Sequence, residues 1–164
     1  MTEKSNLYKR FEFLIVILNL FMTLSIIIVN WNTKDLLKKC LQSIYNETRD
    51  IDFEIFVVDN ASQDGSAKMV REDFSSVQLI TNKENLGFAK ANNQAIGKAT
   101  GKYVLLLNPD TEIFENTFKK MVEFMNSRLD VGIVGPKLIN SNKTLQPSCR
   151  RYPDLSSQIL TLLK

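Results

Sequence analysis

Short runs of apolar, often β-branched residues recur along the chain from Met22 onward, and each run predicts a strand. These runs are residues 25–29, 53–58, 77–81, 103–107 and 131–134. Between the runs, apolar residues recur at the spacing of a helix face. The helices predicted from this spacing cover residues 36–45, 66–74, 88–99 and 118–125. Strands that alternate with helices in this way predict an α/β sandwich with a mainly parallel sheet.

The polar residues and glycines that flank these helices predict where two of them begin and end. Asn32 or Thr33 precedes the first helix and is suited to cap its amino end. Gly101 follows the third helix, and a glycine at that place is typical of a helix C-cap.

The longest apolar stretch covers residues 11–29 and follows a basic flank. A membrane-spanning helix needs about 20 apolar residues, so the stretch is long enough for one. Residues 25–29 are β-branched, however, and end at the polar triplet Asn30-Trp31-Asn32, a pattern that favours a buried strand followed by a functional loop. We therefore expect residues 1–21 to be an apolar extension outside the fold. A membrane-associating helix and a cleaved signal are the alternatives.

Length and composition limit the classes of function that the chain can have. Its 164 residues allow one domain, and a formal net charge of +3 is too small to imply nucleic acid as an obligatory partner. The two cysteines, Cys40 and Cys149, form no CxxC pair, which favours a reduced cytoplasmic compartment.

Several familiar catalytic arrangements are missing from the sequence. The chain has no histidine, which excludes Ser-His and Cys-His nucleophile pairs and HExxH zinc sites. It also has neither GxGxxG nor GxxxxGK[ST], so a dinucleotide dehydrogenase and a P-loop enzyme are not expected.

Three predicted strands are each followed at once by a polar loop. The loops are Asn30-Trp31-Asn32, Asp59-Asn60-Ala61-Ser62 and Asn108-Pro109-Asp110. Each one alone is also an ordinary turn sequence. In open α/β sheets, however, ligands bind beyond the carboxyl ends of the strands, so the three loops together predict a ligand site at that edge.

Five segments then carry a resemblance to a known family. They are SIIIVNWN, FEIFVVDNAS followed by DGS, NLGFAKANNQAI, GKYVLLLNPD and LQPSCRRYP. In this order and spacing they resemble the N-terminal half of family 2 inverting glycosyltransferases, most closely the rhamnosyltransferase-like branch that builds bacterial surface polysaccharides. The likeness covers residues 22–153. It implies a GT-A fold, in which a Rossmann-like nucleotide-sugar binding half is joined to an acceptor half.

The resemblance assigns a nucleotide pocket to residues of the first two loops and of the third helix. Asp59 matches the aspartate that accepts a hydrogen bond from the donor's nucleobase. Asn30 and Asn32 line the same pocket, with Asn60 beside them. Gly87 and Asn93 match the glycine and asparagine of a segment that packs below the nucleotide. A helix start with a tolerated polar face is an equally good interpretation of these last two residues.

The third loop matches the metal motif of the family. Asp110 stands at its last acidic position, and Asn108 replaces the first acidic residue. The resemblance implies that Asp110 and the donor's diphosphate together hold a divalent cation, Mg²⁺ or Mn²⁺. The alternative for Asp110 is a helix or turn cap.

The implied reaction transfers a sugar, with rhamnose favoured by the likeness, from a nucleoside diphosphate to a polysaccharide or lipid-linked acceptor in cell-surface glycan synthesis. We expect the protein in the cytoplasm, with a peripheral place at the inner face of the plasma membrane as the alternative. The family takes its general base from the second half, and no motif in this chain marks one. Two hypotheses therefore stand: a glycosyltransferase, or the donor-binding part of one, and an inert fragment that binds nucleotide-sugar or nothing.

Residues 154–164 end the chain with apolar side chains at helical spacing. The neighbouring sequence offers no obvious partner for this apolar face. We expect it to be a truncated apolar tail that promotes self-association or peripheral membrane contact.

Overall fold

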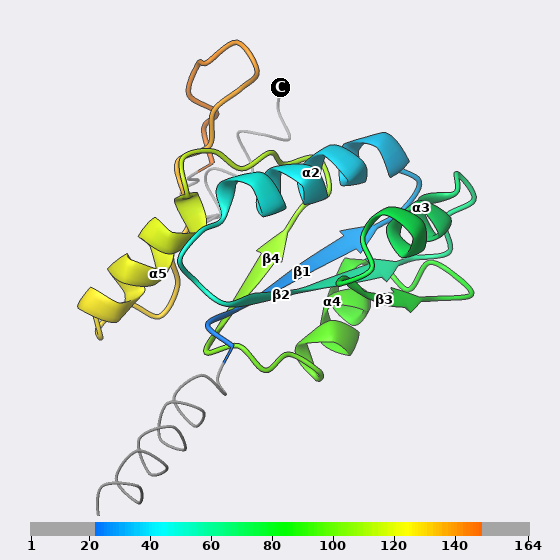
Figure 1. The fold of residues 1–164 in the computed structure, drawn as a ribbon, viewed down its shortest axis with the longest axis horizontal. Coiled ribbons are helices and arrows are strands. Elements are labelled where there is room, and N and C mark those ends of the chain that lie inside the picture. The colour runs from blue at the N-terminus through cyan, green and yellow to red at the C-terminus, as the bar shows by residue number, and fades with distance from the viewer. Residues whose placement is uncertain (1–21, 149–164) are drawn as a thin grey trace, which may run out of the picture. The chain divides into compact units, whose positions relative to one another are not determined.

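The computed structural model describes residues 22–148, which Figure 1 shows in colour. They belong to two compact units, which divide in the sequence between Asp130 and Val131. The extension over residues 1–21, the end of the matched segment over residues 149–153 and the tail over residues 154–164 lie outside the described residues. Within residues 22–148, no helix has both the length and the apolar character needed to cross a bilayer.

The first unit contains a four-stranded parallel sheet with the strand order β3-β2-β1-β4. The strands are β1 (Leu24–Asn30), β2 (Phe53–Asp59), β3 (Gln78–Thr81) and β4 (Tyr103–Leu107). The central pair is in register from Leu24 opposite Phe53 to Asn30 opposite Asp59, so β1 and β2 end together. The predicted α/β fold with a parallel sheet is confirmed.

Helices cover both faces of this sheet. They are α2 (Lys34–Glu47), α3 (Ser66–Asp73), α4 (Phe88–Ile96) and α5 (Thr117–Ser127). Side chains of α2, α3 and α5 pack in one apolar cluster with Ile26 and Ile28 of β1. On the opposite face, α4 packs its Ala91 and Ala95 against Ile27 of β1, and Figure 1 shows α2 and α4 on the two sides of the sheet.

Strand β1 is therefore buried on both faces, which explains its continuous apolar sequence. The strand interpretation of residues 25–29 is confirmed. The alternative of a membrane-spanning helix over residues 11–29 is wrong for residues 24–29, because these residues form a strand that pairs with β2 and β4.

The predicted role of Gly101 as a helix cap is wrong. Helix α4 ends at Ile96 and its C-cap is Gly97. The apolar spacing extends further because Ala99, beyond the helix end, still packs on the α4 side of the sheet. Gly101 lies against β1 instead, where its N–H donates to Ser25 Oγ at 2.8 Å. A Cβ at Gly101 would lie 2.5 Å from the Ser25 backbone nitrogen, so only glycine fits there.

The strand predicted over residues 131–134 is also wrong. This segment has no ladder partner within the described part of the second unit, where the bridge between Ile139 and Leu145 is the pairing observed. The side chain of Ile133 is 93% exposed. An apolar β-branched sequence becomes a strand only when a neighbouring strand accepts its backbone hydrogen bonds.

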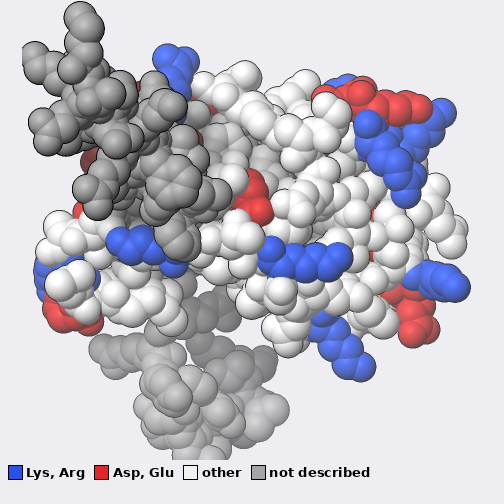
Figure 2. Space-filling model, turned by 60° about the horizontal axis from the view of Figure 1, so that its bottom comes forward, with Lys and Arg blue, Asp and Glu red and all other residues white. Residues whose placement is uncertain are grey.

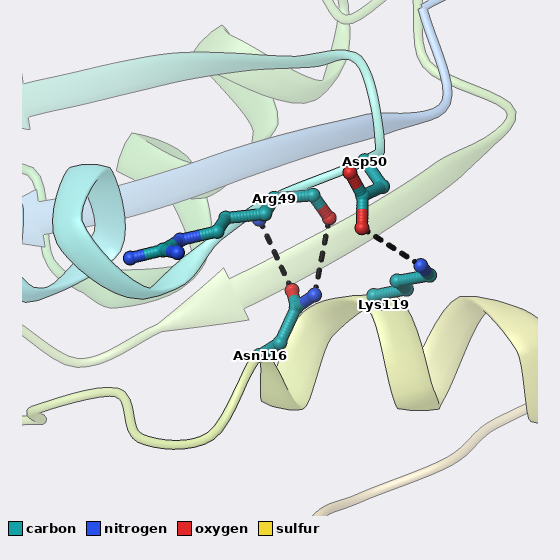
Figure 3. Close-up of polar contacts among 4 residues, drawn as sticks. All are labelled: Arg49, Asp50, Asn116 and Lys119. Carbon is teal, nitrogen blue, oxygen red and sulfur yellow. Dashed lines mark hydrogen bonds and ion pairs between the residues drawn. The ribbon is translucent and has the colours of Figure 1, made fainter.

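Hydrogen bonds and an ion pair connect the start of α5 to the loop between α2 and β2 (Figure 3). Asn116 Oδ1 accepts from the Arg49 N–H at 3.1 Å, and Asn116 Nδ2 donates to the Arg49 carbonyl at 3.2 Å. One helical turn further on, Lys119 Nζ lies 2.9 Å from Asp50 Oδ2. Lys119 holds the pKa of the Asp50 carboxyl below its ordinary value. These contacts hold α5 at the amino ends of the strands.

Charged side chains of both signs are interspersed over the face of the molecule seen in Figure 2. Lysines and arginines there stand apart from one another or beside acidic residues. Outside the atoms drawn in grey, this face carries no continuous basic stripe.

Candidate functional site

The first two polar loops meet where β1 and β2 end. Asn30 and Asp59 are register partners at the last position of their strands, and Asn30 Nδ2 donates to Asp59 Oδ1 at 3.0 Å. Both side chains are buried, at 0% and 3% exposure. Parallel strands bring their carboxyl ends to one edge of the sheet, which is why residues 29 positions apart are in contact.

The two oxygens of Asp59 each accept one hydrogen bond from the protein. Oδ1 accepts from Asn30 Nδ2, and Oδ2 accepts from the Ser62 N–H at 3.0 Å. An ionised carboxylate has about four acceptor positions, so Asp59 has capacity to accept from a ligand as well. The hydrogen bonds from Asn30 and Ser62 fix the orientation of the Asp59 carboxylate, and therefore the direction from which a ligand donates to it.

Ser62 is the centre of this arrangement, and the sequence analysis did not select it as a site residue. Its Oγ accepts from Asn30 Nδ2 at 3.0 Å and from the Asn32 N–H at 2.9 Å. In return, Asn32 Oδ1 accepts from the Gln63 N–H at 2.8 Å. Asn32 and Ala61 adopt φ values of 54° and 63°, in the left-handed region that few residues other than glycine adopt. These hydrogen bonds hold the two loops in a strained conformation.

Trp31 is a second residue that the sequence analysis left unassigned. It lies between Asn30 and Asn32, and its side chain is 56% exposed. A large aromatic ring that faces solvent beside buried polar groups is typical of a binding surface. The signal that identifies it is its position directly after a buried strand.

Asp64 closes the two loops and caps the first helix. Its Oδ2 accepts from the Lys34 N–H at 2.8 Å, and its Oδ1 accepts from the N–H and hydroxyl of Ser66 at 3.0 and 2.5 Å. Burial alone raises the pKa of Asp64, but the hydrogen bonds from Ser66 and Lys34 outweigh burial and hold the pKa below its ordinary value. Thr33 occupies the N-cap position of α2 without capping it, because its hydroxyl donates to Asn30 Oδ1 at 2.6 Å. The predicted side-chain cap from Asn32 or Thr33 is therefore wrong.

Asn60 and Gly87 lie beside the same edge. The Asn60 N–H donates to the Asn30 carbonyl at 2.8 Å, and Asn60 Nδ2 donates to the Gly87 carbonyl at 3.4 Å. Gly87 has φ 76° and ψ 171°, a conformation that is essentially restricted to glycine. No atom lies within 4 Å of the place where a Cβ would stand at Gly87, so this residue borders open space.

Asn93 is not brought into these contacts. It is exposed on α4, whereas its neighbour Asn92 is buried and donates from Nδ2 to the Phe88 carbonyl at 2.9 Å. Asn92 Oδ1 has no hydrogen-bond partner within residues 22–148. The structure therefore separates Asn93 from the cluster of Asn30, Asp59 and Asn60.

The third loop follows β4, which pairs with β1 at the edge of the sheet. Both Asn108 and Asp110 are exposed, and the Asn108 carbonyl accepts from the Thr111 N–H at 3.3 Å. Behind the loop, burial and then the nearby Asp110 carboxylate raise the pKa of Cys40 to about 12. Cys40 is a protonated, buried thiol at neutral pH, so it does not act as a nucleophile.

The third loop offers oxygen ligands for a hard divalent cation, but too few to hold the ion without a substrate. Residues 22–148 contain no cluster of three or more Asp, Glu or Cys side chains able to hold an ion. Asp110 nevertheless presents an exposed carboxylate, with an amide oxygen available at Asn108. Mg²⁺ and similar ions bind through one or two carboxylates when substrate phosphates complete the coordination. The residues therefore suit a cation that arrives with a diphosphate.

Comparison with known proteins identifies the family. A family model with the description Glycosyl transferase family 2 matches residues 25–162 of this chain. The chain belongs to glycosyl transferase family 2. The match includes all three polar loops and helix α4.

Similar curated proteins come from several bacteria. The uncharacterized glycosyltransferase YibD of Escherichia coli is 31% identical over 112 residues, which cover 66% of this chain and 32% of YibD. The poly(ribitol-phosphate) beta-glucosyltransferase of Bacillus spizizenii is 32% identical over 108 residues, covering 63% of this chain and 17% of that protein. The chain thus spans a third or less of the length of these relatives.

Solved structures confirm the GT-A fold. The S. aureus TarS 1–349 structure in complex with UDP matches with a TM-score of 0.59 at 25% identity, covering 66% of this chain and 33% of TarS 1–349. The mannosyltransferase PcManGT from Pyrobaculum calidifontis, in complex with GDP-Man and Mn²⁺, matches with a TM-score of 0.57 at 28% identity, covering 65% of this chain and 33% of PcManGT. The chain corresponds to about a third of each structure.

Proposed function

We propose that this chain binds the nucleoside-diphosphate sugar of a family 2 glycosyltransferase at the carboxyl ends of β1, β2 and β4. The observation that carries the proposal is the contact of Asn30 with Asp59 and Ser62, which joins two loops far apart in sequence into one preorganised polar cluster. TarS binds UDP, and PcManGT binds GDP-Man. These two complexes support a ligand of the same class for this chain.

Each loop has a separate task in this proposal. Asp59 accepts a hydrogen bond from an N–H of the nucleobase, with Asn30 and Asn32 shaping the pocket around it. The exposed ring of Trp31 provides a surface on which the base stacks. Asp110 and Asn108 hold the cation that, when bound, neutralises charge on the diphosphate leaving group. The Mn²⁺ in the PcManGT structure supports a divalent cation.

The reaction we propose is transfer of the sugar to an acceptor hydroxyl in cell-surface glycan synthesis. We propose rhamnose as the sugar, a polysaccharide or lipid-linked glycan as the acceptor, and the cytoplasmic face of the plasma membrane as the place. The teichoic-acid and poly(ribitol-phosphate) enzymes among the relatives support a glycan of the cell envelope. We propose that the general base of this transfer is a carboxylate outside residues 22–148.

A competing function is a binding module without transferase activity. The two functions differ in turnover. Both require a nucleotide site.

Isothermal titration of the full chain with UDP and GDP, with and without Mn²⁺, tests the donor site. We expect binding that requires Mn²⁺, and we expect Asp110→Ala to weaken it by about tenfold or more, since one charge-assisted ligand is worth about 1.5–3 kcal/mol. Glu112→Ala is the matched control, because it removes a carboxylate two residues away. Absence of binding in a folded wild type would refute the proposal, and release of free sugar or transfer to an acceptor would distinguish the enzyme from the module.

A further inference from the structure

A second polar cluster lies next to the donor site and is not used by it. Asn82 follows the last residue of β3, and Gln94 lies on α4. Asn82 Nδ2 donates to Gln94 Oε1 at 3.0 Å, and Gln94 Nε2 donates to Asn82 Oδ1 at 3.0 Å. Because each amide both donates to and accepts from the other, the pair fixes which end of each side chain faces its neighbours.

The pair imposes an orientation on Asn60. Asn82 Nδ2 also donates to Asn60 Oδ1 at 2.9 Å. With its oxygen turned toward Asn82, Asn60 has its Nδ2 turned toward the Gly87 carbonyl, to which it donates at 3.4 Å. Asn60 is 2% exposed, so both ends of its amide are used within the protein. Asn60 therefore connects the pair to Gly87.

Gly87 is the last residue in this series of hydrogen bonds. Its carbonyl accepts from Asn60, and its N–H donates to Asn85 Oδ1 at 2.9 Å. The residue adopts a conformation essentially restricted to glycine and begins α4, with open space beside it. Residues 83–85, which lead to it, are exposed and belong to neither β3 nor α4. The Gly87 carbonyl also accepts from the Ala91 N–H at 3.3 Å, so the first turn of α4 and Asn60 together hold Gly87 in place.

We propose that Asn82 and Gln94 are positioning residues that act through Asn60 to hold Gly87 at the side of the donor pocket. The inference rests on the proposed function of that pocket. Neither residue touches the nucleotide, and their effect is to order the loop before the ligand arrives. Ordering a loop in advance raises affinity because the entropy of ordering is not lost on binding.

Isothermal titration of the full chain with UDP and GDP in the presence of Mn²⁺ tests this role. Gln94→Met removes both hydrogen bonds of the pair without adding charge, and we expect it to weaken nucleotide binding about tenfold. Gln94→Glu removes one bond and places two oxygens in contact, and we expect a similar loss. Gln42→Glu, at an exposed position of α2, is the control for added charge and leaves the affinity unchanged.

Three outcomes overturn the proposal. If Gln94→Glu weakens binding and Gln94→Met does not, the loss comes from the introduced carboxylate and the amide pair has no positioning role. If both variants bind as tightly as a wild type that binds, the pair has no positioning role although the donor site stands. If the wild type binds neither nucleotide, the proposed function fails and the positioning role fails with it.

Two further measurements distinguish positioning from general loss of structure. A double-mutant cycle of Gln94→Met with Asn60→Ala is expected to be non-additive in binding free energy, because the effect passes through Asn60. Additive losses would contradict that route. Hydrogen exchange of the ligand-free chain is expected to accelerate at residues 83–89 in Gln94→Met, with β1 unchanged. Exchange that stays at the wild-type rate over residues 83–89 would show that the pair does not hold the loop.

Discussion

At the amino ends of the strands, Glu54 accepts hydrogen bonds from Ser25 Oγ, from the N–H and hydroxyl of Thr100, and from Gln78 Nε2. At the carboxyl ends, Asp59 accepts one bond on each oxygen, from Asn30 and Ser62. Both are carboxylates on β2, one at each end. The protein fills most of the acceptor positions of Glu54. Asp59 retains acceptor positions at the edge of the sheet where ligands bind.

Two glycines show the same difference in steric terms. A Cβ at Gly101, near Glu54, would lie 2.5 Å from a backbone atom of β1. A Cβ at Gly87, near Asp59, would meet nothing within 4 Å. Gly101 is required because the chain is closely packed, and Gly87 is required because of its φ of 76°. The packing around Gly101 at the amino edge is thus closed, and the space beside Gly87 at the carboxyl edge is open.

The largest expected effect is at the closed edge. Gly101→Ala forces a methyl group into backbone, and we expect the free energy of unfolding to fall by about 3 kcal/mol. Urea denaturation followed by circular dichroism measures it. Gly97→Ala is the matched control: Gly97 has φ −64°, and a Cβ there would lie at an ordinary 3.6 Å from Asn93. We expect the control to change stability by less than about 1 kcal/mol. Equal losses in both variants would contradict the close packing at Gly101.

At the open edge, the expected effect is on binding. Ser62→Ala removes the acceptor shared by Asn30 Nδ2 and the Asn32 N–H, and we expect nucleotide affinity to fall by about tenfold, or about 1.4 kcal/mol. Titration with UDP and GDP in the presence of Mn²⁺ measures it. Ser76→Ala, on the surface between α3 and β3, is the control. A variant that binds as the wild type does would show that Ser62 has no part in the pocket.

A smaller effect is expected from Glu54→Gln, about 1 kcal/mol of unfolding free energy, with nucleotide affinity unchanged. Its pH dependence gives a sharper test. Burial raises the pKa of Glu54, but the hydrogen bonds from Thr100, Ser25 and Gln78 outweigh burial and leave it below its ordinary value of 4.5. The stability from this group is present above pH 4.5 and is lost as pH falls through the lower folded-state pKa. Denaturation curves of wild type and variant should therefore converge as pH falls below 4.5, and parallel curves would contradict this.

Much of the fold was predictable because it depends on local pattern. The runs at 25–29 and 103–107 are strands of a parallel α/β sheet, as the apolar sequence indicates. Two of the predictions that failed did so for reasons that lie outside the local sequence. Residues 131–134 have strand composition but no partner strand within the described part of their unit. The role of Gly101 depends on Ser25 of β1, 76 residues earlier.

The candidate site was predictable to a similar degree. Asp59 and Asn30 follow from the rule that polar residues after parallel strands gather at one edge, and the structure brings them into contact. Ser62 and Gln94 did not follow from any motif. Their importance comes from hydrogen bonds to residues 32 and 12 positions away, which become visible only when the strands and helices are assembled.

The amino-acid sequence by itself determined the alternation of strands and helices, the family, and the three loops at which a ligand is expected, because apolar spacing and short motifs are local properties. The tertiary structure decided which polar groups are satisfied within the protein and which remain open. That distinction depends on distances between segments remote in sequence: Glu54 meets Thr100 across 46 residues, and Asn30 meets Ser62 across 32. Hydrogen bonds between such segments form only at distances of about 3 Å, and packing of the whole domain is what brings them that close.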